Sequence, residues 1–160
     1  MARALVPLAL VFILAACGGG TQRQATSTRV LHGPGYSFAV PAAWRRFTAR
    51  HTVGARHGSA DVSVQWFLLE KPYDEAKFTA ASRELDGVVA KLATQAGRTV
   101  EERTTTTVAG QKIRAYRYGT TRIGFVLVDT REYQLLCRLG SGGSDPDGAC
   151  ETLFSSFSLS

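Results

Sequence analysis

Acidic side chains are absent from the first 60 residues of this 160-residue chain, and the first of them is Asp61. The same stretch carries seven arginines and no lysine, whereas residues 61–160 carry 12 basic and 13 acidic side chains. Almost all of the formal charge of +6 therefore belongs to the first part of the chain. A run of one sign of charge points either to an anionic partner or to a solvated face.

Motifs of the common enzyme classes are also missing. No Gly-x-Ser-x-Gly nucleophile elbow occurs, and the glycine-rich stretch 140–144 lacks the lysine of a phosphate-binding loop. His57, Ser59 and Asp61 are close in sequence, but alternate residues of an extended strand do not converge on one bond. We therefore expect no catalytic residues and no cofactor, with a small extracytoplasmic hydrolase as the alternative function.

A metal site lacks its usual ligands as well. The three histidines, His32, His51 and His57, all precede Asp61, with no acidic side chain among them. Zinc sites need three or four convergent ligands. Solvated or capping roles explain these histidines better, so we expect no metal.

Only one long apolar run occurs, from Ala4 to Ala16, with Arg3 before it. It is shorter than the roughly 20 apolar residues that span a bilayer. A charged start, a short apolar middle and small residues at the end are typical of a cleaved export signal. We place this signal at residues 1–16.

The end of this run, Leu14-Ala15-Ala16-Cys17, resembles the bacterial lipobox. The resemblance implies that the Cys17 thiol receives a diacylglyceryl group and that cleavage then frees its amine. Two or more acyl chains, such as palmitate, give a stable membrane anchor. Residues 17–29 are polar and small, which predicts a flexible tether, and residues 30–160 have the size of one domain.

Strand patterns occupy most of this domain. Pro41 cannot donate to a ladder, so the first strand should end there and the turn should place Trp44 on the core. The run 123–128 is apolar on both faces and predicts a central strand. The predicted strands are 36–40, 45–51, 60–69, 99–108, 112–118, 121–129 and 133–139.

Two helices complete the pattern. A long helix is predicted over 75–96, with Asp74 as its N-cap and Gly97 as its left-handed stop. Its apolar positions recur at helical spacing and form one stripe: Phe78, Ala81, Leu85, Val88, Val89, Leu92 and Ala96. Asp145 and Pro146 begin a short final helix. This order predicts an α+β fold, a twisted antiparallel sheet with one long and one short helix on one side of it.

The domain resembles the PsbP-like family over residues 30–159. The resemblance is carried by YSFAVPAAW at 36–44, by the turn at 108–111, and by the closing Phe154-Ser155-Ser156-Phe157. It implies a twisted antiparallel sheet with packed helices and a non-enzymatic protein that binds partners. The family has no shared catalytic residues to transfer, and a fold alone does not imply a function.

Two cysteines remain once Cys17 is lipidated. Cys137 shares a strand face with Tyr133 and Leu135, and Cys150 shares a helix face with Phe154 and Phe157. Both thiols then point into the layer between helix and sheet. Since export leads to an oxidising compartment, a disulfide is favoured over two buried free thiols.

The early positive charge supplies a candidate binding surface. Four arginines of the folded part are candidates for contact with an anionic lipid or an anionic envelope polymer: Arg45, Arg46, Arg50 and Arg56. The alternative is a solvated basic strand neutralised in space by Glu70, Glu101 or Glu102.

These features together predict an exported lipoprotein on the extracytoplasmic side of the cell membrane, or on its periplasmic face. Its partners would be the membrane, through the anchor, and an unidentified protein or ligand, with no nucleic acid. A binding module predicts an apolar groove or exposed patch between sheet and helix. An enzyme predicts a pocket that joins a histidine, an acid and a nucleophile.

Overall fold

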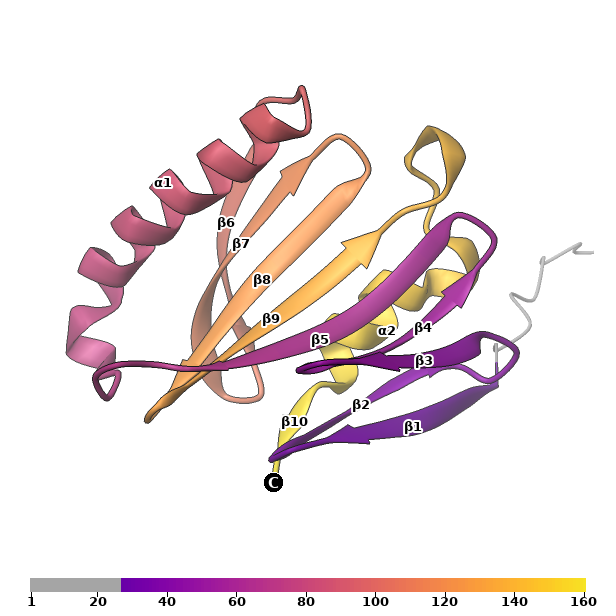
Figure 1. The fold of residues 1–160 in the computed structure, drawn as a ribbon, viewed down its shortest axis with the longest axis horizontal. Helices are drawn as coiled ribbons and strands as arrows, with labels where there is room; N and C mark the ends of the chain where they lie inside the picture. Colours follow the sequence, from indigo (N-terminus) through magenta and orange to yellow (C-terminus); the bar gives the residue numbers. More distant parts are fainter. Residues whose placement is uncertain (1–26) are drawn as a thin grey trace, which may run out of the picture.

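The computed structural model describes residues 27–160 (Figure 1). The predicted export signal 1–16 and the predicted lipid site Cys17 lie outside the described residues. In chain order, the elements are β1 (Thr28–Gly33), β2 (Tyr36–Pro41), β3 (Arg45–Ala49), β4 (Thr52–His57), β5 (Ala60–Leu68), the 3-10 turn η1 (Glu75–Lys77), α1 (Phe78–Gln95), β6 (Glu102–Val108), β7 (Gln111–Tyr118), β8 (Thr121–Val128), β9 (Arg131–Arg138), the 3-10 turns η2 (Ser141–Gly143) and η3 (Pro146–Gly148), α2 (Ala149–Ser156) and β10 (Ser158–Leu159).

The described strands form two antiparallel sheets. The larger has seven strands in the order β3-β4-β5-β9-β8-β7-β6, and the smaller has three in the order β1-β2-β10. Strands β6 to β9 follow one another with short turns, and β8 lies inside the larger sheet, as its two apolar faces predicted. The predicted α+β class, antiparallel strands with one long and one short helix, is confirmed.

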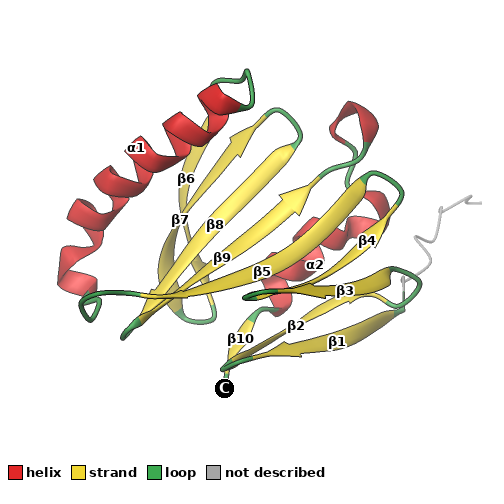
Figure 2. Cartoon of the chain, viewed as in Figure 1, coloured by secondary structure: helices red, strands yellow, loops and turns green. Residues whose placement is uncertain are grey.

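The two helices lie on opposite faces of the large sheet, so the prediction of one shared side was wrong. Val89 of α1 packs with Tyr116, Ile123 and Phe125 in one hydrophobic cluster. Phe154 of α2 belongs to the other cluster, together with the small sheet's inner residues. Figure 2 shows α1 across β6–β8 and α2 behind the sheet. A sheet apolar on both faces needs cover on both, which explains the arrangement.

The ends of the long helix follow the predicted signals. Asp74 caps the first turn, because its Oδ1 accepts a hydrogen bond from the Ala76 amide at 3.0 Å. That turn is 3-10, and the α-helix proper runs from Phe78 to Gln95. Gly97 follows in the left-handed conformation, with φ +66°, which glycine adopts without steric cost.

The apolar stripe of α1 is only partly covered. Val89 and Ala93 are its buried residues, whereas Val88 and Leu92 are 49% and 39% exposed. The predicted stripe is therefore wider than the contact with the sheet, and one flank of the helix presents apolar side chains to solvent.

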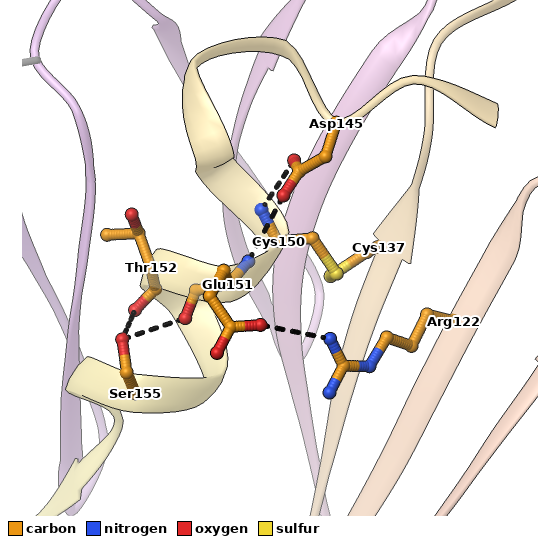
Figure 3. Close-up of a disulfide and its surroundings, with 7 residues drawn as sticks. All are labelled: Arg122, Cys137, Asp145, Cys150, Glu151, Thr152 and Ser155. Atoms are coloured by element: carbon orange, nitrogen blue, oxygen red, sulfur yellow. Dashed lines mark hydrogen bonds and ion pairs between the residues drawn. A yellow bond between two sulfur atoms is a disulfide. The ribbon is translucent and has the colours of Figure 1, made fainter. Parts of the chain in front are cut away.

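The final helix, α2, is fixed by a disulfide and by a side-chain cap from Asp145 (Figure 3). Cys137 on β9 and Cys150 on α2 are joined, with Cα atoms 5.6 Å apart. The α-helix starts at Ala149, after a 3-10 turn that begins at the predicted Pro146. Across that turn, the Asp145 carboxylate accepts hydrogen bonds from the amides of Cys150 and Glu151, at 2.9 and 3.3 Å, which suits a helix N-terminus.

Three strands were not anticipated at their observed positions. β1 begins at Thr28, so the last two residues of the predicted tether 17–29 belong to a strand. β4 and the short β10 were not predicted, and β10 pairs with β2 at the edge of the small sheet.

Candidate functional site

A groove lies between α1 and the neighbouring end of the large sheet. Its volume is about 380 Å³. Its walls come from α1, the segment after β5, β8 and β9. The apolar lining residues include Leu69, Pro72, Ala81, Leu85, Val88 and Leu127. Phe67, 40% exposed, lies opposite Glu132 in the β5–β9 ladder and so extends the apolar surface toward the groove.

The charges around the groove are balanced. Lys71 and Lys77 contribute positive charge to its lining, and Glu84 and Glu132 contribute negative charge. Histidine, cysteine and serine are absent from its described lining, and its polar groups come from Tyr73, the two lysines and the two glutamates. Its chemistry is that of an apolar binding site with a polar rim.

A polar cluster fixes α1 against the sheet beside this groove. The Asp86 carboxylate accepts hydrogen bonds from Arg114 at 3.2 Å and from the Tyr116 hydroxyl at 2.8 Å. Burial alone would raise the pKa of Asp86, but these hydrogen bonds and the charges of Arg114 and Arg103 lower it. Burial raises the pKa of Tyr116, which keeps the hydroxyl protonated as a donor. The helix wall of the groove is therefore held by charge-assisted hydrogen bonds.

The predicted arginines are divided among three places. The ladders place Arg45 directly opposite Arg56, Arg56 opposite Asp61, and Asp61 opposite Arg138. Side chains that stand opposite one another in a ladder share a face of the sheet. We call these four residues the arginine row. It crosses β3, β4, β5 and β9 on the same face as α1, next to the part of the sheet that α1 covers.

Arg46 and Arg50 do not belong to this row. Arg46 follows Arg45 on β3 and therefore points to the opposite face. Arg50 lies in the turn between β3 and β4, at the other end of that hairpin. Of the four candidate arginines, only Arg45 and Arg56 therefore share this row, and Arg138 is a member that the sequence pattern did not suggest.

The positive charge of the row is only partly neutralised. Arg138 pairs with Asp61 at 3.6 Å, and the Arg56 guanidinium stacks over the Phe47 ring, 4.8 Å from its centroid. Burial raises the pKa of Asp61, and the charges of Arg138 and Arg56 oppose that rise. Within residues 27–160, Arg45 and Arg56 form no ion pair within 4 Å.

Two of the three glutamates proposed to neutralise the basic strand pair with another arginine. Glu101 and Glu102 both pair with Arg117, at 2.8 and 3.3 Å. Glu70 forms no ion pair with an arginine in the described part of the chain. Within residues 27–160, none of these three glutamates forms an ion pair with Arg45, Arg46, Arg50 or Arg56.

The chain enters the domain beside the arginine row. The Ser27 carbonyl accepts a hydrogen bond from the Ala42 amide at 2.8 Å, three residues before Arg45. Arg29 donates to the Trp44 carbonyl. The start of β1 and the β4–β5 turn lie on the same side of the molecule in Figure 1. Ser27, the first described residue, thus lies at the end of the sheet that carries the arginine row, and the apolar groove lies at the far end of β5.

The histidines do not gather into a site. His51 stacks on Trp66, with ring centroids 4.4 Å apart, and His32 is exposed on β1. His57 shares a sheet face with Ala55, whereas Asp61 lies on the other face. Among the residues that the structure describes, no three His, Cys, Asp or Glu side chains lie together in a way that could hold a metal.

From Ser27 to the last residue, no helix is both long and apolar enough to cross a membrane. No protein-family model matches the chain, and no curated protein matches it significantly.

Proposed function

We propose that this chain is a non-catalytic lipoprotein of the bacterial cell envelope whose domain binds a partner or ligand at the membrane surface. Lipid on Cys17 would hold the domain on the extracytoplasmic side of the membrane. The observation that carries the proposal is the groove beside α1, because a binding module predicts an apolar hollow between helix and sheet. The kinship with the PsbP-like family stays a prediction.

The exposed flank of α1 supports the same proposal. Val88 and Leu92 are large apolar side chains left open to solvent on a helix that buries Val89 and Ala93 against the sheet. Exposed apolar surface of this kind is typical of interaction sites. The polar cluster of Asp86, Arg114 and Tyr116 keeps the helix in place, so the groove does not depend on a bound ligand for its walls.

Crosslinking in intact cells tests the binding function. A photoreactive phenylalanine analogue in place of Val88 should form an adduct with a defined partner or ligand, identified by mass spectrometry. The same analogue in place of Thr94, exposed on α1 but outside the groove lining, is the matched control. A second change inside the groove, Ala81→Glu, should remove the adduct. Equal labelling from Val88 and Thr94 would contradict a binding role for the groove.

The anchor has a separate test. Cells that express the Cys17→Ala variant should incorporate no fatty-acid probe into this protein, because the thioether needs the cysteine sulfur. The wild-type chain, labelled in parallel, should incorporate the probe and partition with membranes. Equal incorporation in both chains would refute lipidation at Cys17.

A further inference from the structure

The arginine row contains a repulsion that its single carboxylate offsets only in part. Arg45 and Arg56 stand directly opposite each other on β3 and β4, where side-chain Cβ atoms are roughly 5 Å apart and like charges destabilise the pair. The only carboxylate of the row, Asp61, already pairs with Arg138 at 3.6 Å. Three guanidinium groups therefore share one carboxylate.

The guanidinium groups are also arranged for recognition. Phe47 supports the Arg56 guanidinium from one side, which leaves its planar set of N–H donors free for a bidentate contact. Arg45, Arg56 and Arg138 are all exposed, and neighbouring strands set them along a line of about 14 Å from β3 to β9. A shallow hollow of about 230 Å³ lies along this line, lined by Phe47, Arg56, Asp61 and Arg138 among others.

We propose that Arg45, Arg56 and Arg138 bind the phosphate groups of anionic phospholipids and turn this end of the sheet toward the membrane. Arginine forks match phosphate oxygens in a bidentate manner, and a phosphate placed between Arg45 and Arg56 would relieve their repulsion. The occupant is assigned to the membrane because the first described residue on the side of Cys17, Ser27, is hydrogen-bonded to Ala42, three residues before Arg45. The inference rests on the proposed lipid anchor, which brings the row to the bilayer.

The orientation has a consequence for the proposed binding function. With the row against the lipid, the groove beside α1 lies at the opposite end of β5 and stays open to a partner from the aqueous side. One end of the domain would then contact the membrane while the other contacts the ligand.

The test uses the chain from Cys17 onward, which contains every residue that the structure describes. With the disulfide intact, Cys17 has the only free thiol, and capping it with iodoacetamide removes any contribution from an acyl chain. Binding is measured by flotation with vesicles of phosphatidylcholine alone and with vesicles that also contain phosphatidylglycerol. We expect binding to the second kind only, weakened by salt because exposed charges are screened.

Two double variants with the same change of charge separate the row from general basicity. Arg45→Ser with Arg56→Ser should weaken binding to the anionic vesicles roughly 25-fold, about fivefold for each arginine. Arg46→Ser with Arg50→Ser alters the same hairpin outside the row and should weaken binding far less. Arg138→Ser should resemble the first pair, and circular dichroism confirms that each variant is folded.

Three results would overturn the inference. The first is equal binding to neutral and anionic vesicles, and the second is an equal loss in the two double variants. The third is displacement from vesicles by inorganic phosphate at low millimolar concentration, which would make a free phosphate the occupant instead of the lipid. None of these results depends on Cys17 labelling or on the Val88 adduct, so the proposed function can stand or fall separately.

Discussion

Loss of the disulfide should lower the free energy of unfolding by about 3 kcal/mol, the chain-entropy estimate for so short a loop. Cys137 and Cys150 are 13 residues apart in sequence, and the bond ties β9 to α2. Both cysteines are almost fully buried, at 0% and 2% exposure. Alanine at both positions removes the bond without adding a polar group to the core. In a domain of this size, the melting temperature should fall by roughly 10 °C.

The measurement compares thermal unfolding with and without reductant. Because the two sulfurs are buried, the wild-type protein is unfolded in denaturant with reductant and then refolded before the scan. It should then melt near the temperature of the Cys137→Ala/Cys150→Ala variant, whereas that variant should not respond to reductant at all. Recovery of both cysteines as free thiols in non-reducing peptide maps of exported protein would refute the assignment.

Short-range sequence patterns predicted most of the helices and strands. Alternation in 60–69 predicts a strand because Val62 and Val64 fall on one face, and both are buried in β5. The N-cap and the left-handed stop of the long helix are backbone requirements met by two residue types, so Asp74 and Gly97 identify its ends. The disulfide was predictable because each cysteine shares a face with aromatic residues of the same layer.

The strand β4 was not predicted from the sequence, because it contains a glycine and an arginine. Gly54 resembles a strand break, but it marks a close approach: a Cβ there would lie 2.6 Å from both the Phe47 ring and the Val62 carbonyl. The backbone and an aromatic ring therefore exclude any side chain at this position. β1 escaped for another reason, since Leu31 is its only buried residue and no alternation is visible.

The prediction that both helices lie on one side of the sheet was wrong, although the sequence contains a signal for their placement. The apolar stripe of α1 shows that the helix has an inner side but not which face of the sheet it covers. The strand with two apolar faces, β8, holds Ile123 and Phe125 toward α1, and Gly124 leaves room for Phe154 of α2. A strand that is apolar on both faces must be covered on both. This argument places the two helices on opposite sides of the sheet.

The arginine row could not be found from a run of charge. It depends on the register of three ladders and includes Arg138, which lies far along the chain in a region without excess positive charge. Conversely, Arg45 and Arg46 are adjacent in sequence and are separated onto two faces by the period of the strand. Pairing register, which is a tertiary property, decides which charges act together.

Replacing Trp44 with alanine should have the largest effect of any single substitution considered, a loss of about 3–5 kcal/mol of unfolding free energy. Trp44 is 2% exposed and packs in the main hydrophobic cluster. Its indole N–H also donates to the Asp147 carboxylate at 2.9 Å. The side chain thereby joins the β2–β3 connection to the turn that leads into α2, and its removal leaves a cavity between them.

Two variants separate the packing of Trp44 from its hydrogen bond. Trp44→Phe retains most of the apolar contact and loses the bond to Asp147, so its cost should be about 1–3 kcal/mol. Trp66→Ala is the matched aromatic control, because Trp66 is only half-buried and is packed at the margin of the same cluster, and its loss should cost clearly less than Trp44→Ala. Urea unfolding followed by circular dichroism gives all three values. An order in which Trp66→Ala is the most damaging would show that the β2–β3 connection does not hold this end of the core.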